Sequence, residues 1–274
     1  MDNALEACCD DFDRAISRLK LLSAHNALLL LRACLSAPKI MPILLCSPSS
    51  DHTQLLQFDL SLCRGLFVIT NTDRIDIHWI QASIPVRAGE LGVRHVAMLA
   101  YSTFMAFAAS TRDLKSQLLL NCHPAPDPHV DSVIMLWTAS HNIPLLDNTS
   151  AIKQHAWDAP VIVADKASLW SSLTNSHNRA RLLAVSSSHS GYWLYALPMA
   201  SCGTRLDNEA IRVAVWLCLG VNLCEPHMCP YGTLVDTKGS HGLSCKRSAG
   251  TSIHHHQLND MIRQVLTLWT PGDG

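Results

Sequence analysis

Cysteine and histidine residues occur at metal-ligand spacing in the C-terminal part of the sequence. Cys224, Cys229, His241 and Cys245 are separated by four, eleven and three residues. Two thiolates on a short loop, followed by a histidine and a cysteine one helical turn apart, can close a tetrahedral zinc site. Chance proximity of scattered thiols is the alternative, because the chain contains eleven Cys and fifteen His. The spacing predicts a structural zinc ion and leaves that alternative open.

Other residues that could carry chemistry are better explained by structure. Asp10 and Asp11 are adjacent, like the paired metal-binding aspartates of a polymerase, but no aromatic residue precedes them and their surroundings have a helical pattern. We interpret them as a solvated helix face. The histidines at 254–256 either bind metal or form the polar start of a helix. The sequence has no phosphate-binding glycine loop and no hydrolase nucleophile elbow, so no enzyme class is indicated by these motifs.

Composition limits the class of protein and its partners. The 274 residues are 48% hydrophobic and 16% charged, which indicates a folded, rather apolar protein. A net charge of −1 argues against strong autonomous nucleic-acid binding, which usually needs a basic face. The odd number of Cys and the absence of a secretory pattern indicate reduced thiols in an intracellular protein. No span reaches the roughly 18 apolar residues needed to cross a bilayer, and the candidate at 27–31 is cut by Arg32, so we expect no membrane-spanning segment.

The elements that must position these residues are predicted to be helices, so the fold class is mainly α. Apolar residues recur at helical spacing, with capping residues such as Asp207 and a stop at Gly220. We predict irregular structure over 142–160 and one or two helices after residue 168. The other predicted helices cover residues 3–22, 25–35, 51–66, 76–83, 96–110, 113–120, 130–141, 209–219 and 258–269. Three prolines within 121–128 mark the best domain boundary, which separates 1–120 from the rest of the chain.

Several long strings resemble a known family, the reverse transcriptases of invertebrate non-LTR retrotransposons. The string LLSAHNALLLLRACLSAPKIMPILLCSPS (21–49) is similar to the segment that follows the polymerase palm, and WIQASIPVRAGELGVR (79–94) to a tryptophan and glycine run of the same family. Glu90 stands where that run has its second glycine. The resemblance resumes over 189–220 and continues through the Cys/His block to HHHQLNDMI (254–262).

The resemblance implies a helical thumb-like bundle over 1–120, a connector over 121–184, and a second small helical region over 185–274 with a degenerate Cys/His knuckle. The family's Cys-Cys-His-Cys motif falls on Cys229, Tyr231, His241 and Cys245, with tyrosine in place of a cysteine ligand. The missing ligand could be replaced by Cys224, His227 or His255. The basic pair that would contact nucleic acid is Lys246 and Arg247. Two basic positions of the family are here Thr251 and His254.

The expected function is that of a fragment of the retrotransposon polyprotein without catalytic activity of its own. In the family, an RNA-directed DNA polymerase, the palm would lie before Met1 and an endonuclease after Gly274. Without their paired carboxylates neither nucleotidyl transfer nor strand cleavage has a mechanism here. Residual zinc binding and weak binding of RNA or DNA would remain, with self-association through apolar faces that once met the palm. The alternative is a recruited, zinc-stabilised intracellular interaction protein.

Overall fold

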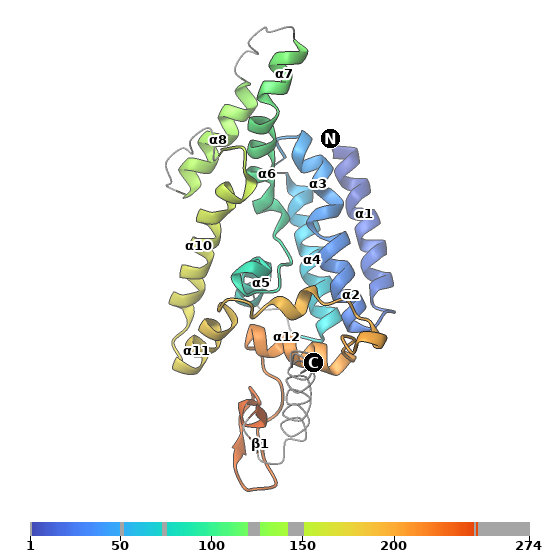
Figure 1. The fold of residues 1–274 in the computed structure, drawn as a ribbon, viewed down its shortest axis with the longest axis vertical. Helices are drawn as coiled ribbons and strands as arrows, with labels where there is room; N and C mark the ends of the chain where they lie inside the picture. Colours follow the sequence, from blue (N-terminus) through green and yellow to red (C-terminus); the bar gives the residue numbers. More distant parts are fainter. Residues whose placement is uncertain are drawn as a thin grey trace, which may run out of the picture. The chain divides into compact units, whose positions relative to one another are not determined.

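The computed structural model describes residues 2–49, 52–72, 76–119, 127–141, 151–243 and 245. Contacts between Cα atoms divide the chain into two units, Met1–Gly220 and Val221–Gly274. The described residues are mainly helical, with one two-stranded hairpin (Figure 1). The predicted mainly α class is therefore confirmed. The helix predicted over 258–269 lies outside the described residues.

The N-terminal helices of the first unit pack into a bundle. They are α1 (Asp2–Leu19), α2 (Ala24–Leu30), the π-helical turn η1 (Leu31–Leu35), α3 (Ala37–Cys46), α4 (Thr53–Thr70) and α6 (Val96–Ser110). Helix α1 packs on α4, and both α3 and α4 pack on α6. The apolar residues of α1 recur on one face, and that face is buried. At its centre the rings of Phe12 and Phe58 stack with their centroids 4.2 Å apart.

A helical run extends through the bundle from Ala24 to Cys46, with a bend at Ser36 between η1 and α3. It has 23 residues and a mean hydropathy of 1.7, so by length and composition alone it could cross a membrane. The core helix of a soluble protein or a signal sequence passes the same test. Arg32 does not end the helix, because its Nη1 donates to the Leu194 carbonyl oxygen at 2.7 Å and its guanidinium lies over the Tyr195 ring.

The N-terminus of α6 is capped by a residue from another helix. Asp59, in the middle of α4, is 4% exposed. One of its carboxylate oxygens accepts from the backbone N–H of Val96 at 2.7 Å, and the other accepts from that of Ala97 at 2.9 Å. His95 Nδ1 lies 2.8 Å from the second oxygen. This carboxylate satisfies two of the N–H groups that a helix start leaves without partners, and so it ties α4 to α6.

The second half of the first unit adds a further layer of helices. They are α5 (Asp76–Ser83), η2 (Val86–Ala88), α7 (Arg112–Leu118), α8 (Pro128–His141), α10 (Gln154–Ser172), α11 (Ser176–Val185), η3 (Tyr192–Tyr195), η4 (Ala200–Cys202) and α12 (Asn208–Leu219). Helix α10 contradicts the irregular structure predicted up to residue 160, since it begins at Gln154 and contains Pro160. Trp157 explains the difference, because it is buried edge-on against Trp137, with ring centroids 5.0 Å apart. This packing outweighs the lost hydrogen bond of the proline.

A buried polar network joins α5, α11 and α12 to the loop after η2. Gln81 Nε2 donates to Glu90 Oε2 and to the Cys218 carbonyl oxygen, both at 2.9 Å. Arg181 donates to the same carbonyl oxygen and to Gln81 Oε1. The glycine before Glu90 fixes the loop, because Gly89 has φ of +94° and a Cβ there would lie 1.9 Å from the Val185 carbonyl oxygen.

Glu90 is expected to make the stability of this unit depend on pH. The side chain is 1% exposed, and Oε1 has no hydrogen-bond partner among the described residues. Burial raises the pKa of Glu90 to about 7, although the hydrogen bond from Gln81 and the charges of Arg181 and Lys166 oppose the rise. The folded carboxyl therefore keeps its proton where the unfolded one has lost it, so stability falls as the pH rises from about 4.5 to about 7.

Glu90→Gln tests this expectation. Above about pH 7 the variant should be more stable than the natural protein by on the order of 3 kcal/mol, and near pH 4.5 the two should be similar. Urea unfolding followed by far-UV circular dichroism at the two pH values measures the difference. Glu209→Gln is the control, because that side chain is 74% exposed. Equal stabilities of natural and Glu90→Gln proteins above pH 7 would contradict the assignment.

Candidate metal site

The second unit, Val221–Gly274, contains a short hairpin that positions Cys229. Strands β1 (His227–Met228) and β2 (Leu234–Val235) are antiparallel, with His227 opposite Val235 and Met228 opposite Leu234. Cys229 begins the connecting turn. Its backbone N–H donates to the Thr233 carbonyl oxygen at 2.9 Å, and its own carbonyl oxygen accepts from the Gly232 N–H at 2.8 Å. Gly232 has φ of +76°, a conformation that favours glycine.

The turn directs backbone N–H groups at the sulfur of Cys229. The Tyr231 N–H donates to Cys229 Sγ, with the two heavy atoms 3.4 Å apart. Burial of Cys229 tends to raise the pKa of its thiol, but hydrogen bonds from the backbone of Tyr231 and Thr233 and from His241 outweigh it and lower the pKa to about 7. A thiol with this pKa is substantially ionised at neutral pH, and the thiolate is the form that binds a metal.

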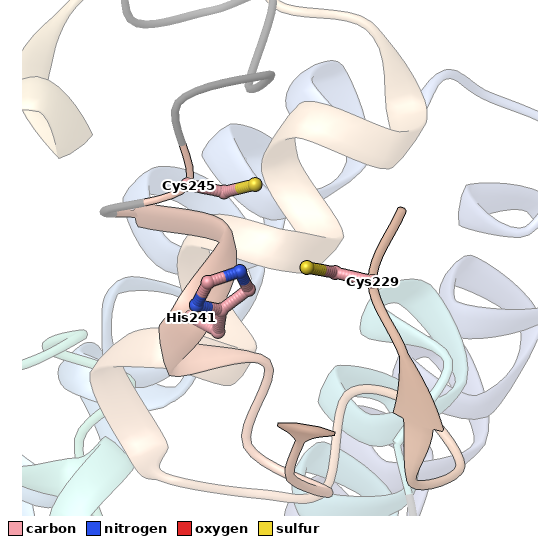
Figure 2. A group of neighbouring side chains, drawn as sticks. All are labelled: Cys229, His241 and Cys245. Carbon is pink, nitrogen blue, oxygen red and sulfur yellow. The ribbon is translucent and has the colours of Figure 1, made fainter. Parts of the chain in front are cut away.

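Cys229, His241 and Cys245 converge on one point. His241 lies on the 3-10 helix η5 (Ser240–Leu243), and Cys245 follows it two residues after the helix ends. Gly239, with φ of +64°, makes the turn into η5, and a Cβ there would lie 3.1 Å from Leu223 Cδ2. The ligand atoms of the three side chains all lie within 4.8 Å of one another. Figure 2 shows the two sulfur atoms and the imidazole ring facing a common space.

This group could hold a metal ion. The ligands of a tetrahedral zinc ion, with bonds of about 2.3 Å to sulfur and 2.0 Å to nitrogen, lie roughly 3.5–3.8 Å apart. Separations of up to 4.8 Å therefore require the three side chains to close by at most about 1.3 Å. Two thiols and one imidazole are also donors that suit zinc. The residues present fit such an ion in both geometry and donor type.

The structure brings together three of the four ligands predicted from spacing. Cys224 is outside the group, and its thiol donates to the Asp236 carbonyl oxygen at 3.3 Å. His227, named as a substitute, is also outside it, with Nδ1 2.9 Å from the Glu225 carbonyl oxygen. Tyr231 contributes its backbone N–H, while its side chain is 56% exposed. His255, Lys246 and Arg247 lie outside the described residues.

Two features of the site were not predicted. One is the hairpin itself, and the other is the N–H to sulfur bond that lowers the pKa of Cys229. The sequence Cys-Pro-Tyr-Gly at 229–232 was the available signal, since proline and glycine in that order are typical of a tight turn. The interpretation of Asp11 as part of a solvated helix face is confirmed, because it is exposed and pairs with Arg14 and with Lys39.

Comparisons of the chain with protein-family models, curated proteins and solved structures gave no match.

Proposed function

We propose that this chain binds one structural zinc ion through Cys229, His241 and Cys245, and that it is a thumb-and-linker segment related to non-LTR retrotransposon reverse transcriptases. The observation that carries the proposal is the convergence of these three side chains within 4.8 Å, at positions of the family's knuckle. The second unit is small, and its described strands have only two residues each. Such a hairpin is marginal by itself, so a bound ion would supply much of its stability.

Zinc content tests the metal part of the proposal. The full chain, purified without chelators and analysed by elemental mass spectrometry, should carry about one zinc ion per molecule, as a single such group requires. Removal of zinc with a chelator should increase amide hydrogen exchange in residues 221–245 and leave the helices of the first unit protected. A full chain without zinc, with the same exchange before and after chelation, would contradict the proposal.

Residual nucleic-acid binding is the second part of the proposal. Lys246 and Arg247 follow Cys245 in the sequence, and no cluster of basic residues in the chain is larger, so they are the first candidates to contact phosphates. With a net charge of −1 the chain should bind single-stranded RNA weakly and with a strong dependence on salt. Replacing both residues with alanine should reduce the slope of log K against log salt by roughly 1.4. Fluorescence anisotropy with Arg18→Ala/Lys20→Ala as the control measures this, and an unchanged slope would exclude the pair.

A recruited, zinc-stabilised intracellular interaction protein is the second candidate. The near-neutral net charge favours it, because a protein that grips nucleic acid usually has a basic face. Zinc binding without any RNA binding at low salt would support this candidate over the first.

Self-association is also part of the proposal, because large apolar side chains are exposed, including Leu21 at 84%, Leu118 at 72% and Met135 at 71%. Light scattering that shows only monomers at about 10–50 µM, within the range where exposed apolar surface causes association, would contradict it.

A further inference from the structure

We propose that the ion held by Cys229, His241 and Cys245 keeps one exchangeable coordination position, which takes a small external donor such as water, an anion or a thiol. This inference rests on the proposed metal binding and deepens it. Among the described residues, the group consists of three side chains, whereas a closed structural zinc site has four protein ligands. Three protein ligands with an external fourth ligand is the arrangement that permits exchange.

Cys224 is the remaining residue of the spacing pattern. Hydrogen bonds of the backbone around it hold it away from Cys229, His241 and Cys245. The N–H groups of Leu223 and Cys224 both donate to the Thr237 carbonyl oxygen, at 2.7 and 3.2 Å. The thiol of Cys224 then points to the Asp236 carbonyl oxygen on the same segment. To reach the ion, Cys224 would have to give up these contacts, which extend the pairing of the hairpin. The position of Cys224 therefore follows from the fold of the hairpin.

His227 is likewise engaged, and residue 231 offers no side-chain ligand. His227 Nδ1 bonds to the carbonyl oxygen of Glu225, two residues before it and just outside strand β1. Tyr231 stands where the resembling family has a cysteine, and its N–H is directed at Cys229 Sγ. The exposed ring of Tyr231 replaces a thiol that would have completed the four ligands.

The group lies close to the surface of its unit. Cys229 is 7% exposed and the Nε2 atom of His241 is buried, whereas His241 and Cys245 as whole residues are half-buried. A local movement of side chains would therefore admit a small donor without unfolding the turn. Water would occupy the fourth position of a bound ion when no stronger donor is present, and a stronger donor at higher concentration would replace it.

Cobalt(II) substitution of the full chain tests the inference, because the visible absorption of cobalt reports its ligands. Cobalt is added to the chelator-treated protein, and thiocyanate or imidazole is then titrated in separate experiments. The expected result is a saturable shift of the cobalt bands with either donor, fitted by one site, while cobalt stays bound. The spectrum of the Cys224→Ser protein and that of the His255→Ala protein should match the natural one before titration.

The other outcomes separate this inference from the proposed function. Bound cobalt with bands that neither donor moves would overturn the exchangeable position and leave metal binding intact. A changed starting spectrum in Cys224→Ser or His255→Ala would identify a fourth protein ligand and would also overturn it. Failure to take up cobalt or zinc at all would overturn the proposed metal site and this inference together.

Discussion

Replacing Cys229 and Cys245 together with serine is expected to abolish stoichiometric zinc binding and to unfold the described part of the second unit. The two residues supply both sulfur atoms of a three-residue group. Structural zinc sites in small domains contribute apparent binding free energies of about 10–16 kcal/mol, so the loss of two ligands should weaken binding by at least about 1,000-fold. The hairpin, with strands of two residues, has little else to stabilise it.

The matched control uses two cysteines that are not part of the group. Cys34 and Cys46 are exposed thiols in the helical run of the first unit. A Cys34→Ser/Cys46→Ser protein should keep about one zinc ion per chain and natural hydrogen exchange in residues 221–245. Far-UV circular dichroism of both variants should stay close to that of the natural protein, because most of the described helix lies in the first unit. Retention of zinc by Cys229→Ser/Cys245→Ser would mean that other residues bind it.

Asp59→Ala should cause the largest loss of stability of any single substitution discussed for the first unit. The carboxylate is buried and accepts from the N–H groups of Val96 and Ala97 at the start of α6. Alanine leaves both N–H groups without an acceptor in the interior. Since each buried unsatisfied group costs roughly 1–3 kcal/mol, we expect a loss of about 3 kcal/mol or more in the free energy of unfolding.

Two control substitutions separate capping from a general effect of removing a charge. Asp59→Asn keeps one acceptor oxygen and should lose less, about 1–2 kcal/mol, as for the loss of a charge-assisted bond. Asp10→Ala removes an exposed carboxylate and should change stability by less than about 0.5 kcal/mol. Urea unfolding followed by far-UV circular dichroism compares all three proteins. If Asp59→Ala unfolds at the same urea concentration as the natural protein, the cap contributes nothing to stability.

Local signals in the sequence predicted much of the helical fold. Helices α5 (Asp76–Ser83) and α6 (Val96–Ser110) have the predicted bounds, because their apolar spacing and flanking residues are local properties. Asp207 caps α12 and Gly220 ends it in the left-handed conformation, as predicted. Features that depend on distant residues were not predicted. Asp59 caps a helix that starts 37 residues later, and Trp157 holds a helix through a proline by packing on Trp137.

The difference between local signals and distant contacts also explains which of the predicted ligands lie together at the metal site. The spacing of cysteine and histidine correctly grouped Cys229, His241 and Cys245, because short connections limit how far apart they can lie. Spacing could not show that Cys224 would be held elsewhere, since its position depends on bonds from the backbone to Thr237. Tyr231 was considered only as a missing ligand. Its contribution through the backbone N–H does not depend on which side chain the residue carries.

The turn at 229–232 also determines how such a site can change in evolution. The backbone hydrogen bonds of Cys229 and the bond from the Tyr231 N–H to the sulfur of Cys229 do not depend on the side chain of residue 231. Side-chain substitutions at residue 231 can therefore leave the turn in place. A single nucleotide change converts a tyrosine codon to a cysteine codon, and that change would add a thiol to this turn.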